Sequence, residues 1–215
     1  MAIQPIINPP VPSLPLGTEQ YERRYQDQYS NVLRLYFNQL NNALSTLLGT
    51  TGGKYLRNPY GAFSSYSNQT ATANTATLVT LSNTDFSNTV SITSSKITVE
   101  NAGIYNLQFS IQFQNTDNQI QDISIWLRQN GVNIAGSTGY VSIPARKSAS
   151  AGEEAHEIIG WNYYVNMAAG DYIQIYWSTT LAAVTIKTYA ASTGPIRPST
   201  ASVVATLSFV STLPT

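Results

Sequence analysis

The segment Gly103–Asn115 alternates strictly between apolar and polar side chains from residue 105 onward, and this constrains the fold more than any other feature. The apolar set is Tyr105, Leu107, Phe109, Ile111 and Phe113, and the intervening residues are Asn, Gln or Ser. Because successive side chains of a β-strand point to opposite faces, a period of two predicts a strand with one face in a core. A helix would scatter these residues around its axis, so the middle of the chain is predicted to be β.

Short segments with strand character follow one another through residues 58–215. Ile123, Ile125 and Leu127 repeat the alternation and lead to Asn130-Gly131, a dipeptide typical of a tight hairpin. Further strands are predicted between turns rich in Gly, Ser and Thr. These strands are Thr75–Ser82, Thr89–Glu100, Val132–Ile143, His156–Met167, Asp171–Thr180, Val184–Ala190 and Ser202–Leu213. So many short antiparallel strands predict a β-sandwich or jelly-roll head over residues 58–215.

Residues 1–17 are predicted to form an extended arm, because five prolines exclude a helix and favour extended backbone. Nothing local can bury the apolar side chains of this arm. Two interpretations stay open: a free tail, or a docking peptide that lies in a groove of another protein. We favour docking. The docking residues would be Ile3, Ile6, Ile7, Pro9, Pro10, Val11, Leu14 and Leu16.

Residues 18–48 are predicted to form a long α-helix that Thr18 caps, followed by a glycine hinge that ends at residue 57. One apolar stripe recurs at steps of three or four. Its members are Tyr25, Tyr29, Val32, Tyr36, Leu40, Ala43 and Leu47. So broad an apolar face needs a partner, either the chain's own β domain or the helices of other copies. We favour a trimerisation segment over residues 18–57.

Four aromatic residues break the rule that a strand of a sandwich has one apolar face. Trp126, Tyr164, Tyr172 and Tyr176 each stand opposite the core-facing set of their own strand. Clustered outward aromatics indicate a second buried surface, since large exposed apolar patches are unusual on monomers. Tyr and Trp are also enriched at protein interfaces. The four residues are therefore predicted to form the trimer interface of the head.

The balance of charges and the shortage of reactive residues exclude several function classes. Lys and Arg number 11, as do Asp and Glu, so no basic surface is expected to bind nucleic acid. With no Cys and the single histidine His156, a standard zinc site cannot form within one chain. The carboxylates Glu100, Asp117, Asp122 and Asp171 lie mostly at predicted strand ends or turns, where acids are expected anyway. We therefore expect no enzyme activity, no metal and no cofactor.

The sequence predicts neither a secretion signal nor a membrane span. Residues 1–17 lack Lys and Arg, and no apolar run reaches about 18 residues. We expect no membrane insertion, and synthesis in the cytoplasm.

The head resembles the jelly rolls of the complement globular head and tumour necrosis factor families. The resemblance rests on Ile97–Phe109, which contains Gly-x-Tyr before the alternating strand, on Leu127–Val132, and on Ala169–Tyr176. Phe209 lies where the closing strand returns to the core. The resemblance covers the chain from about residue 58 and implies a jelly roll that trimerises through aromatic faces.

The N-terminal part resembles a different group, the short fibre or decoration proteins of tailed phages, particularly those of marine or cyanobacterial hosts. The similar segments are Pro12–Tyr25 and Asn58–Phe63. This resemblance implies a non-enzymatic structural protein on the virion surface. Its arm would bind other virion proteins of the capsid, collar or tail. Its trimeric head would adhere weakly to host-surface carbohydrate. The alternative is a free trimeric, lectin-like carbohydrate-binding module.

Overall fold

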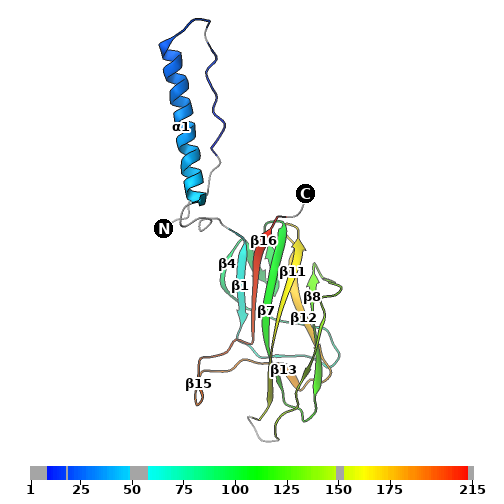
Figure 1. Ribbon diagram of the computed structural model, residues 1–215. Coiled ribbons are helices and arrows are strands. Elements are labelled where there is room, and N and C mark those ends of the chain that lie inside the picture. The colour runs from blue at the N-terminus through cyan, green and yellow to red at the C-terminus, as the bar shows by residue number, and fades with distance from the viewer. Residues whose placement is uncertain (1–8, 18, 49–57, 149–152, 213–215) are drawn as a thin grey trace. The chain divides into compact units, whose positions relative to one another are not determined.

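The computed structural model describes residues 9–17, 19–48, 58–148 and 153–212 (Figure 1). The chain divides into two compact units, residues 1–57 and residues 58–215, which we call the N-terminal unit and the head. The two units are described separately below.

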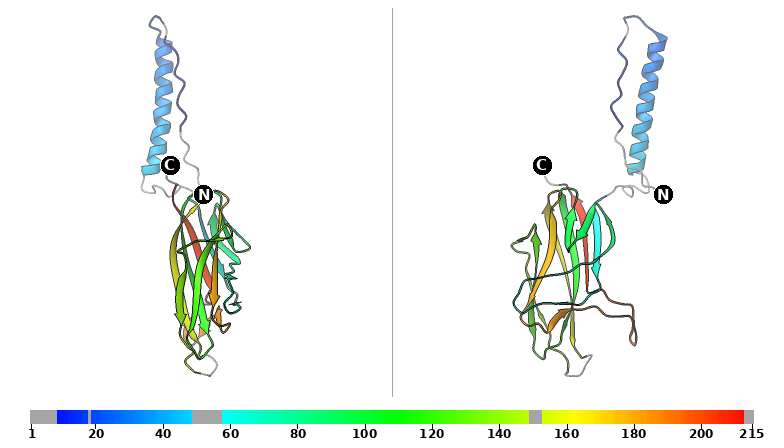
Figure 2. Two further views of the ribbon diagram at one scale, coloured as in Figure 1. Left: turned by 90° about the vertical axis from the view of Figure 1, so that its right-hand side faces the viewer. Right: turned by 180° about the vertical axis from the view of Figure 1, so that it is seen from behind.

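One helix, α1 (Arg23–Leu48), makes up most of the N-terminal unit. It starts at Arg23, five residues after the predicted start. The first helical hydrogen bond runs from the Gln26 amide to the Glu22 carbonyl. Glu22 therefore occupies the N-cap position, where the positive end of the helix dipole stabilises its negative charge. Residues 9–17 form neither helix nor strand, and they run alongside α1 in each view (Figures 1 and 2).

The head is an antiparallel β-sandwich of two seven-stranded sheets. Sheet A contains β1 (Tyr60–Ser65), β2 (Gln69–Thr70), β4 (Asn83–Asn88), β7 (Gly103–Asn115), β11 (Ala155–Met167), β13 (Val184–Ile186) and β16 (Val203–Ser211). Sheet B contains β3 (Thr77–Leu78), β5 (Val90–Thr93), β6 (Lys96–Val99), β8 (Gln121–Gln129), β9 (Val132–Asn133), β10 (Gly139–Ile143) and β12 (Tyr172–Thr179). A separate hairpin joins β14 (Ser192–Thr193) to β15 (Ile196–Arg197).

The chain passes repeatedly from one sheet to the other, which is consistent with a jelly roll. Strand β7 lies inside sheet A, with β11 along one edge and β16 followed by β13 along the other. Strand β12 has the matching place in sheet B, between β8 on one side and β6 and β3 on the other. The prediction of a mainly β, antiparallel sandwich with one helix is confirmed.

The alternating residues of β7 point into the core as predicted. Tyr105, Leu107, Ile111 and Phe113 are fully buried, and Phe109 is 5% exposed. They pack against the inward side chains of sheet B, among which Trp177 is the largest. Burial of so many large apolar side chains from both sheets is the main source of stability of the head.

Two predicted strands are wrong as single strands, because each contains a turn. Thr89–Glu100 is divided into β5 and β6 by a tight turn in which Ser94 and Ser95 have φ of 50° and 58°. Two consecutive residues with positive φ are the geometry that joins antiparallel strands closely. The second segment, Val132–Ile143, is divided into β9 and β10, and Gly136 between them has φ of 77°.

Candidate functional site

The outer side of sheet A forms one extended surface, which we call face A. It consists of the side chains of β7, β11 and β16 that alternate with the core-facing ones, although Asn106 and Gln114 are each only 7% exposed. These residues are Ile104, Asn106, Gln108, Ser110, Gln112, Gln114, His156, Ile158, Gly160, Asn162, Tyr164, Asn166, Val204, Thr206 and Ser208. None of them is Asp, Glu, Lys or Arg, so face A carries no permanent charge across three neighbouring strands.

The strand register brings the polar and apolar residues of face A together in rows. Asn162, Gln108 and Thr206 are direct neighbours across β11, β7 and β16. In the next row the Asn106 amide donates to Oδ1 of Asn162 at 2.5 Å. Two apolar side chains lie among these uncharged groups and are exposed, Ile158 by 65% and Tyr164 by 61%. Face A therefore combines exposed apolar groups with amides and hydroxyls that need no counter-ion.

Strand β11 adds an open edge to face A. Among the described strands β11 pairs only with β7, through thirteen consecutive residues from Ala155↔Asn115 to Met167↔Gly103. Its other edge pairs with no described strand, although the Asn166 carbonyl accepts a hydrogen bond from the Gln129 side chain. Native proteins cover or blunt edges of this kind, because they are templates for pairing with another chain.

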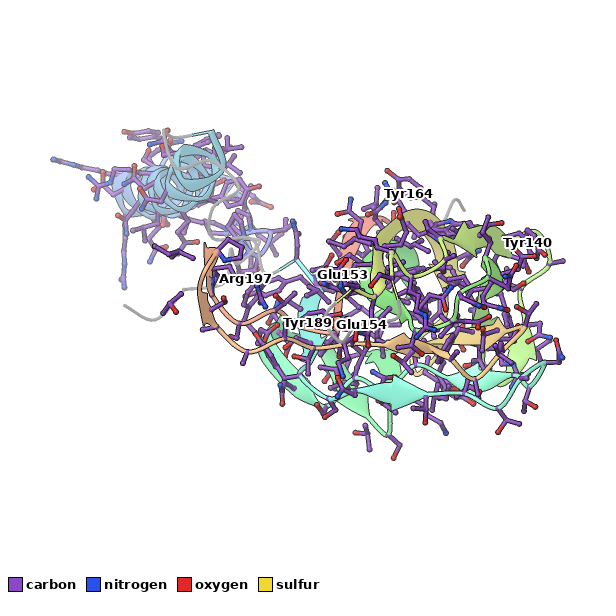
Figure 3. The ribbon with its side chains drawn as sticks, turned by 90° about the horizontal axis from the view of Figure 1, so that it is seen from below. Tyr140, Glu153, Glu154, Tyr164, Tyr189 and Arg197 are labelled. Atoms are coloured by element: carbon purple, nitrogen blue, oxygen red, sulfur yellow. The ribbon has the colours of Figure 1, made fainter. Side chains whose placement is uncertain are left out.

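The structure separates the four aromatics that were predicted to form one trimer interface. Tyr164 lies on face A, at the periphery of the head (Figure 3). Trp126, Tyr172 and Tyr176 lie on the outer side of sheet B, which we call face B, with Trp126 and Tyr176 paired directly across β8 and β12. Alternation identifies the outward side of each strand but not the sheet that the strand joins. The four residues therefore do not share one surface of a single head, and their place in a trimer interface stays a prediction.

The stripe predicted along the helix is half-buried within the N-terminal unit. Tyr25, Tyr29, Val32, Tyr36, Leu40 and Ala43 are all partly covered. Tyr25 and Tyr29 stack with ring centroids 6.2 Å apart. The neighbouring apolar residues are more open, and Phe37 is 58% exposed. The side chain of Leu47 lies outside the described residues.

Every third residue of the arm is partly covered, and the residues between are exposed. Pro9, Pro12 and Pro15 are half-buried, a spacing of three that matches one edge of a polyproline II helix. The predicted docking residues Pro10, Val11, Leu14 and Leu16 are exposed, Val11 by 88% and Leu16 by 92%. Ile3, Ile6 and Ile7 lie outside the described residues. Part of the predicted docking set thus remains open to a partner.

Two carboxylates, Asp122 on face B and Asp171 in the turn before β12, hold neighbouring strands and turns together through hydrogen bonds. Asp122 accepts from the Ser142 hydroxyl at 2.6 Å and the Tyr140 hydroxyl at 2.7 Å, and these bonds lower the pKa of Asp122. Asp171 accepts from the Asn130 amide at 2.7 Å and the Ala168 backbone amide at 2.8 Å, which lowers the pKa of Asp171.

We expect Asp171→Asn to destabilise the head by about 1 kcal/mol at neutral pH, a value kept small because the carboxylate is partly exposed. The new amide would place its NH2 group against a donor in either orientation, the Asn130 amide or the Ala168 and Gln129 donors. Because folding lowers the pKa of Asp171, its carboxylate stabilises the fold at pH values above the ordinary Asp pKa. This stabilisation is lost as the pH falls through the pKa that Asp171 has in the folded state. The difference from wild type in urea unfolding should therefore shrink below about pH 4. Glu100→Gln is the control and should change little; an Asp171→Asn penalty that stays constant at low pH would contradict this account.

His156 pairs with a tyrosine rather than with acids. Its Nδ1 lies 2.8 Å from the Tyr189 hydroxyl, and the two rings meet edge to face at 5.3 Å. Burial and then the charge of Glu154 raise the pKa of Tyr189 to about 12, which the Arg197 charge partly opposes. Figure 3 shows Tyr189, Glu154 and Arg197 in this part of the head. In the described part of the chain, no three His, Asp or Glu residues are grouped so that they could hold a metal.

In the described part of the chain, no helix is both long enough and apolar enough to cross a membrane.

Comparison with known proteins assigns no family to the chain. No protein-family model matches it, and no curated protein matches it. Among solved structures, the globular domain of zebrafish complement 1qA protein superposes with a TM-score of 0.41 and 11% sequence identity, covering 73% of this chain and 99% of that chain.

Proposed function

We propose that this chain is a non-enzymatic structural protein whose head associates into a homotrimer through face A. The observation that carries the proposal is the absence of any permanent charge on face A, together with the exposure of Ile158 and Tyr164. Removing a charged group from water costs several kcal/mol unless it is paired, whereas amides and hydroxyls can exchange water for partners on another chain. Face A therefore has the composition of a surface that becomes buried.

The open edge of β11 supports the same assignment. A second copy packed against face A would cover the exposed Ile158 and Tyr164, both of which belong to β11. Asp122 and Asp171 do not suggest a catalytic site instead, because both are engaged in strand and turn contacts.

The N-terminal unit is proposed to attach the trimer to a larger assembly. Exposed Val11, Leu14 and Leu16 on the arm would dock into a partner protein, and the helix would gather three chains. The resemblance of Pro12–Tyr25 and Asn58–Phe63 to fibre and decoration proteins supports the surface of a tailed-phage virion as that assembly. Capsid, collar or tail proteins would then be the partners, and immunogold labelling of intact particles would test the location.

The test of the trimer is the solution mass of the full chain and of residues 58–215, measured by light scattering. We expect both to have three times the mass of one chain, because face A lies within the head. If only the full chain is trimeric, the helix gathers the chains and face A is not the interface. If both are monomeric, the proposed trimer is wrong.

A free carbohydrate-binding module is the second candidate function, and the aromatic residues of face B favour it. This candidate shares the trimer but lacks attachment to a particle. Labelling of particles separates the two.

A further inference from the structure

The outer side of sheet B carries a pair of stacked rings that face A does not have. Trp126 and Tyr176 are direct cross-strand neighbours, with ring centroids 6.0 Å apart and planes inclined by 30°. Both side chains are half-buried. We call these two rings, with Arg128 and Asn133 beside them, the aromatic platform.

Polar contacts fix the aromatic platform in one arrangement. Oδ1 of Asn133 accepts from the Trp126 indole at 2.9 Å and from Nε of Arg128 at 2.6 Å. The Arg128 guanidinium lies 3.9 Å from the centre of the Tyr176 ring, within the range of a cation–π interaction. Since both donors use the same oxygen of Asn133, its Nδ2 group is left to donate to a ligand. Rings and donor are thus held in place before any ligand arrives, which lowers the entropy cost of binding.

A groove opens directly beside Trp126. Its walls are Ser124, Trp126, Asn133, Thr138 and the turn formed by residues 134–136, and its volume is about 420 Å³. This volume falls within the roughly 300–1,000 Å³ of small-molecule sites. The lining combines one aromatic ring with two hydroxyls and one amide, so a ligand would need a face that stacks and several groups that hydrogen-bond.

The charges around the aromatic platform balance and are already engaged. Arg128 is held by Asn133 and Tyr176, and Lys96 lies 4.5 Å over the Tyr172 ring. Asp122 on face B and Asp171 in the turn before β12 contribute two negative charges, each with its own hydrogen bonds. No excess positive charge remains here to attract a strongly anionic ligand such as a nucleic acid.

We propose that the aromatic platform and its groove bind a neutral pyranose unit of a glycan. The C–H bonds on one side of such a ring carry partial positive charge and suit the electron-rich face of an indole. Its hydroxyls can accept from the Asn133 amide and exchange hydrogen bonds with Ser124 and Thr138. This inference deepens the proposed function and rests on the proposed trimer. One shallow site binds a glycan weakly, whereas three copies of the site in one trimer bind it with avidity.

The probe is an array of neutral oligosaccharides (cello-, malto-, manno- and chito-oligosaccharides) printed beside sialylated and sulfated ones, read with the full chain. The best neutral hit is then titrated in solution by saturation-transfer NMR against wild type, Trp126→Ala and Asn133→Ala. Asn133 is exposed, so its variant folds even if Trp126→Ala does not. Tyr66→Ala is the matched control, since it removes a 52% exposed aromatic outside the groove.

We expect a neutral oligosaccharide to bind wild type and Tyr66→Ala alike, with affinity falling at least about tenfold in Trp126→Ala and in Asn133→Ala. Retention of anionic glycans alone, or affinity unchanged in both variants, overturns the inference. A trimeric chain that retains no neutral glycan overturns the inference but leaves the proposed trimer intact. A monomeric chain whose glycan binding still depends on Trp126 supports the platform and contradicts the proposed trimer.

Discussion

Replacing Gly139 by valine is expected to lower the free energy of unfolding of the head by about 3 kcal/mol, the upper end of the usual cost of overpacking. Gly139 begins β10 at the edge of sheet B, and Trp161 of β11 in sheet A lies over it. A Cβ atom at residue 139 would lie 1.5 Å from Cζ3 and 1.9 Å from Cη2 of the Trp161 ring. Such atoms cannot coexist, so the indole must leave its site.

Displacing the Trp161 ring removes several stabilising contacts at once. The indole stacks on Phe109 with centroids 6.4 Å apart and planes inclined by 15°, and it packs against the buried core. It therefore covers the core where β10 and β11 of the two sheets come together. A rotated ring would lose this burial and expose the Phe109 side of the core to water.

Guanidinium unfolding at one fixed protein concentration, followed by circular dichroism, measures the effect of Gly139→Val, because assembly makes apparent stability concentration-dependent. Gly194→Ala is the control outside face A, since its new Cβ would meet no atom within 4 Å. A double-mutant cycle with Trp161→Ala isolates the clash. Without the indole, Gly139→Val should cost less than about 1 kcal/mol. An equal penalty in both backgrounds would show that the clash is not the cause.

The sequence was sufficient to predict the strands whose alternation is complete. β7 has the bounds that the pattern predicted, and β11, β12 and β16 agree within two residues at each end. These long strands have one face buried, so core packing enforces the same period that the sequence shows. The strand β4 was not predicted, because Asn83–Asn88 contains one large apolar residue, Phe86, and that residue is exposed.

The candidate surfaces were less predictable than the strands, since they depend on which strands become neighbours. Tyr164, Trp126 and Tyr176 were identified as outward-facing, and they are. Their division between two opposite faces follows from the pairing of β11 with β7 and of β8 with β12, which involves residues far apart in the chain. Face A was not predicted from the sequence, because it is defined by the lack of charged residues on three strands that are far apart in the chain. A count of charged residues at the outward positions of 104–114, 156–166 and 204–208 could have found it.

If the head forms the proposed trimer through face A, placing one charge on face A is expected to dissociate it. Gln108→Glu changes an amide to a carboxylate of nearly equal size, in the middle of a row between Asn162 and Thr206. Burying an unpaired carboxylate costs several kcal/mol, and face A offers no Lys or Arg as a partner. In a trimer this cost arises three times, so association should weaken at least about 100-fold, which corresponds to about 2.7 kcal/mol.

Light scattering at micromolar concentration should then give the mass of one chain for residues 58–215 carrying Gln108→Glu, with an unchanged circular dichroism spectrum because Gln108 is exposed. Gln119→Glu is the matched control. It makes the same chemical change at an exposed position between β7 and β8, and it should leave the trimer intact. Gln108→Lys should dissociate the trimer as well, because the cost arises from desolvation and not from the sign of the charge. If both Gln108 variants stay trimeric, face A is solvent-exposed in the assembly, and its uncharged composition requires another explanation.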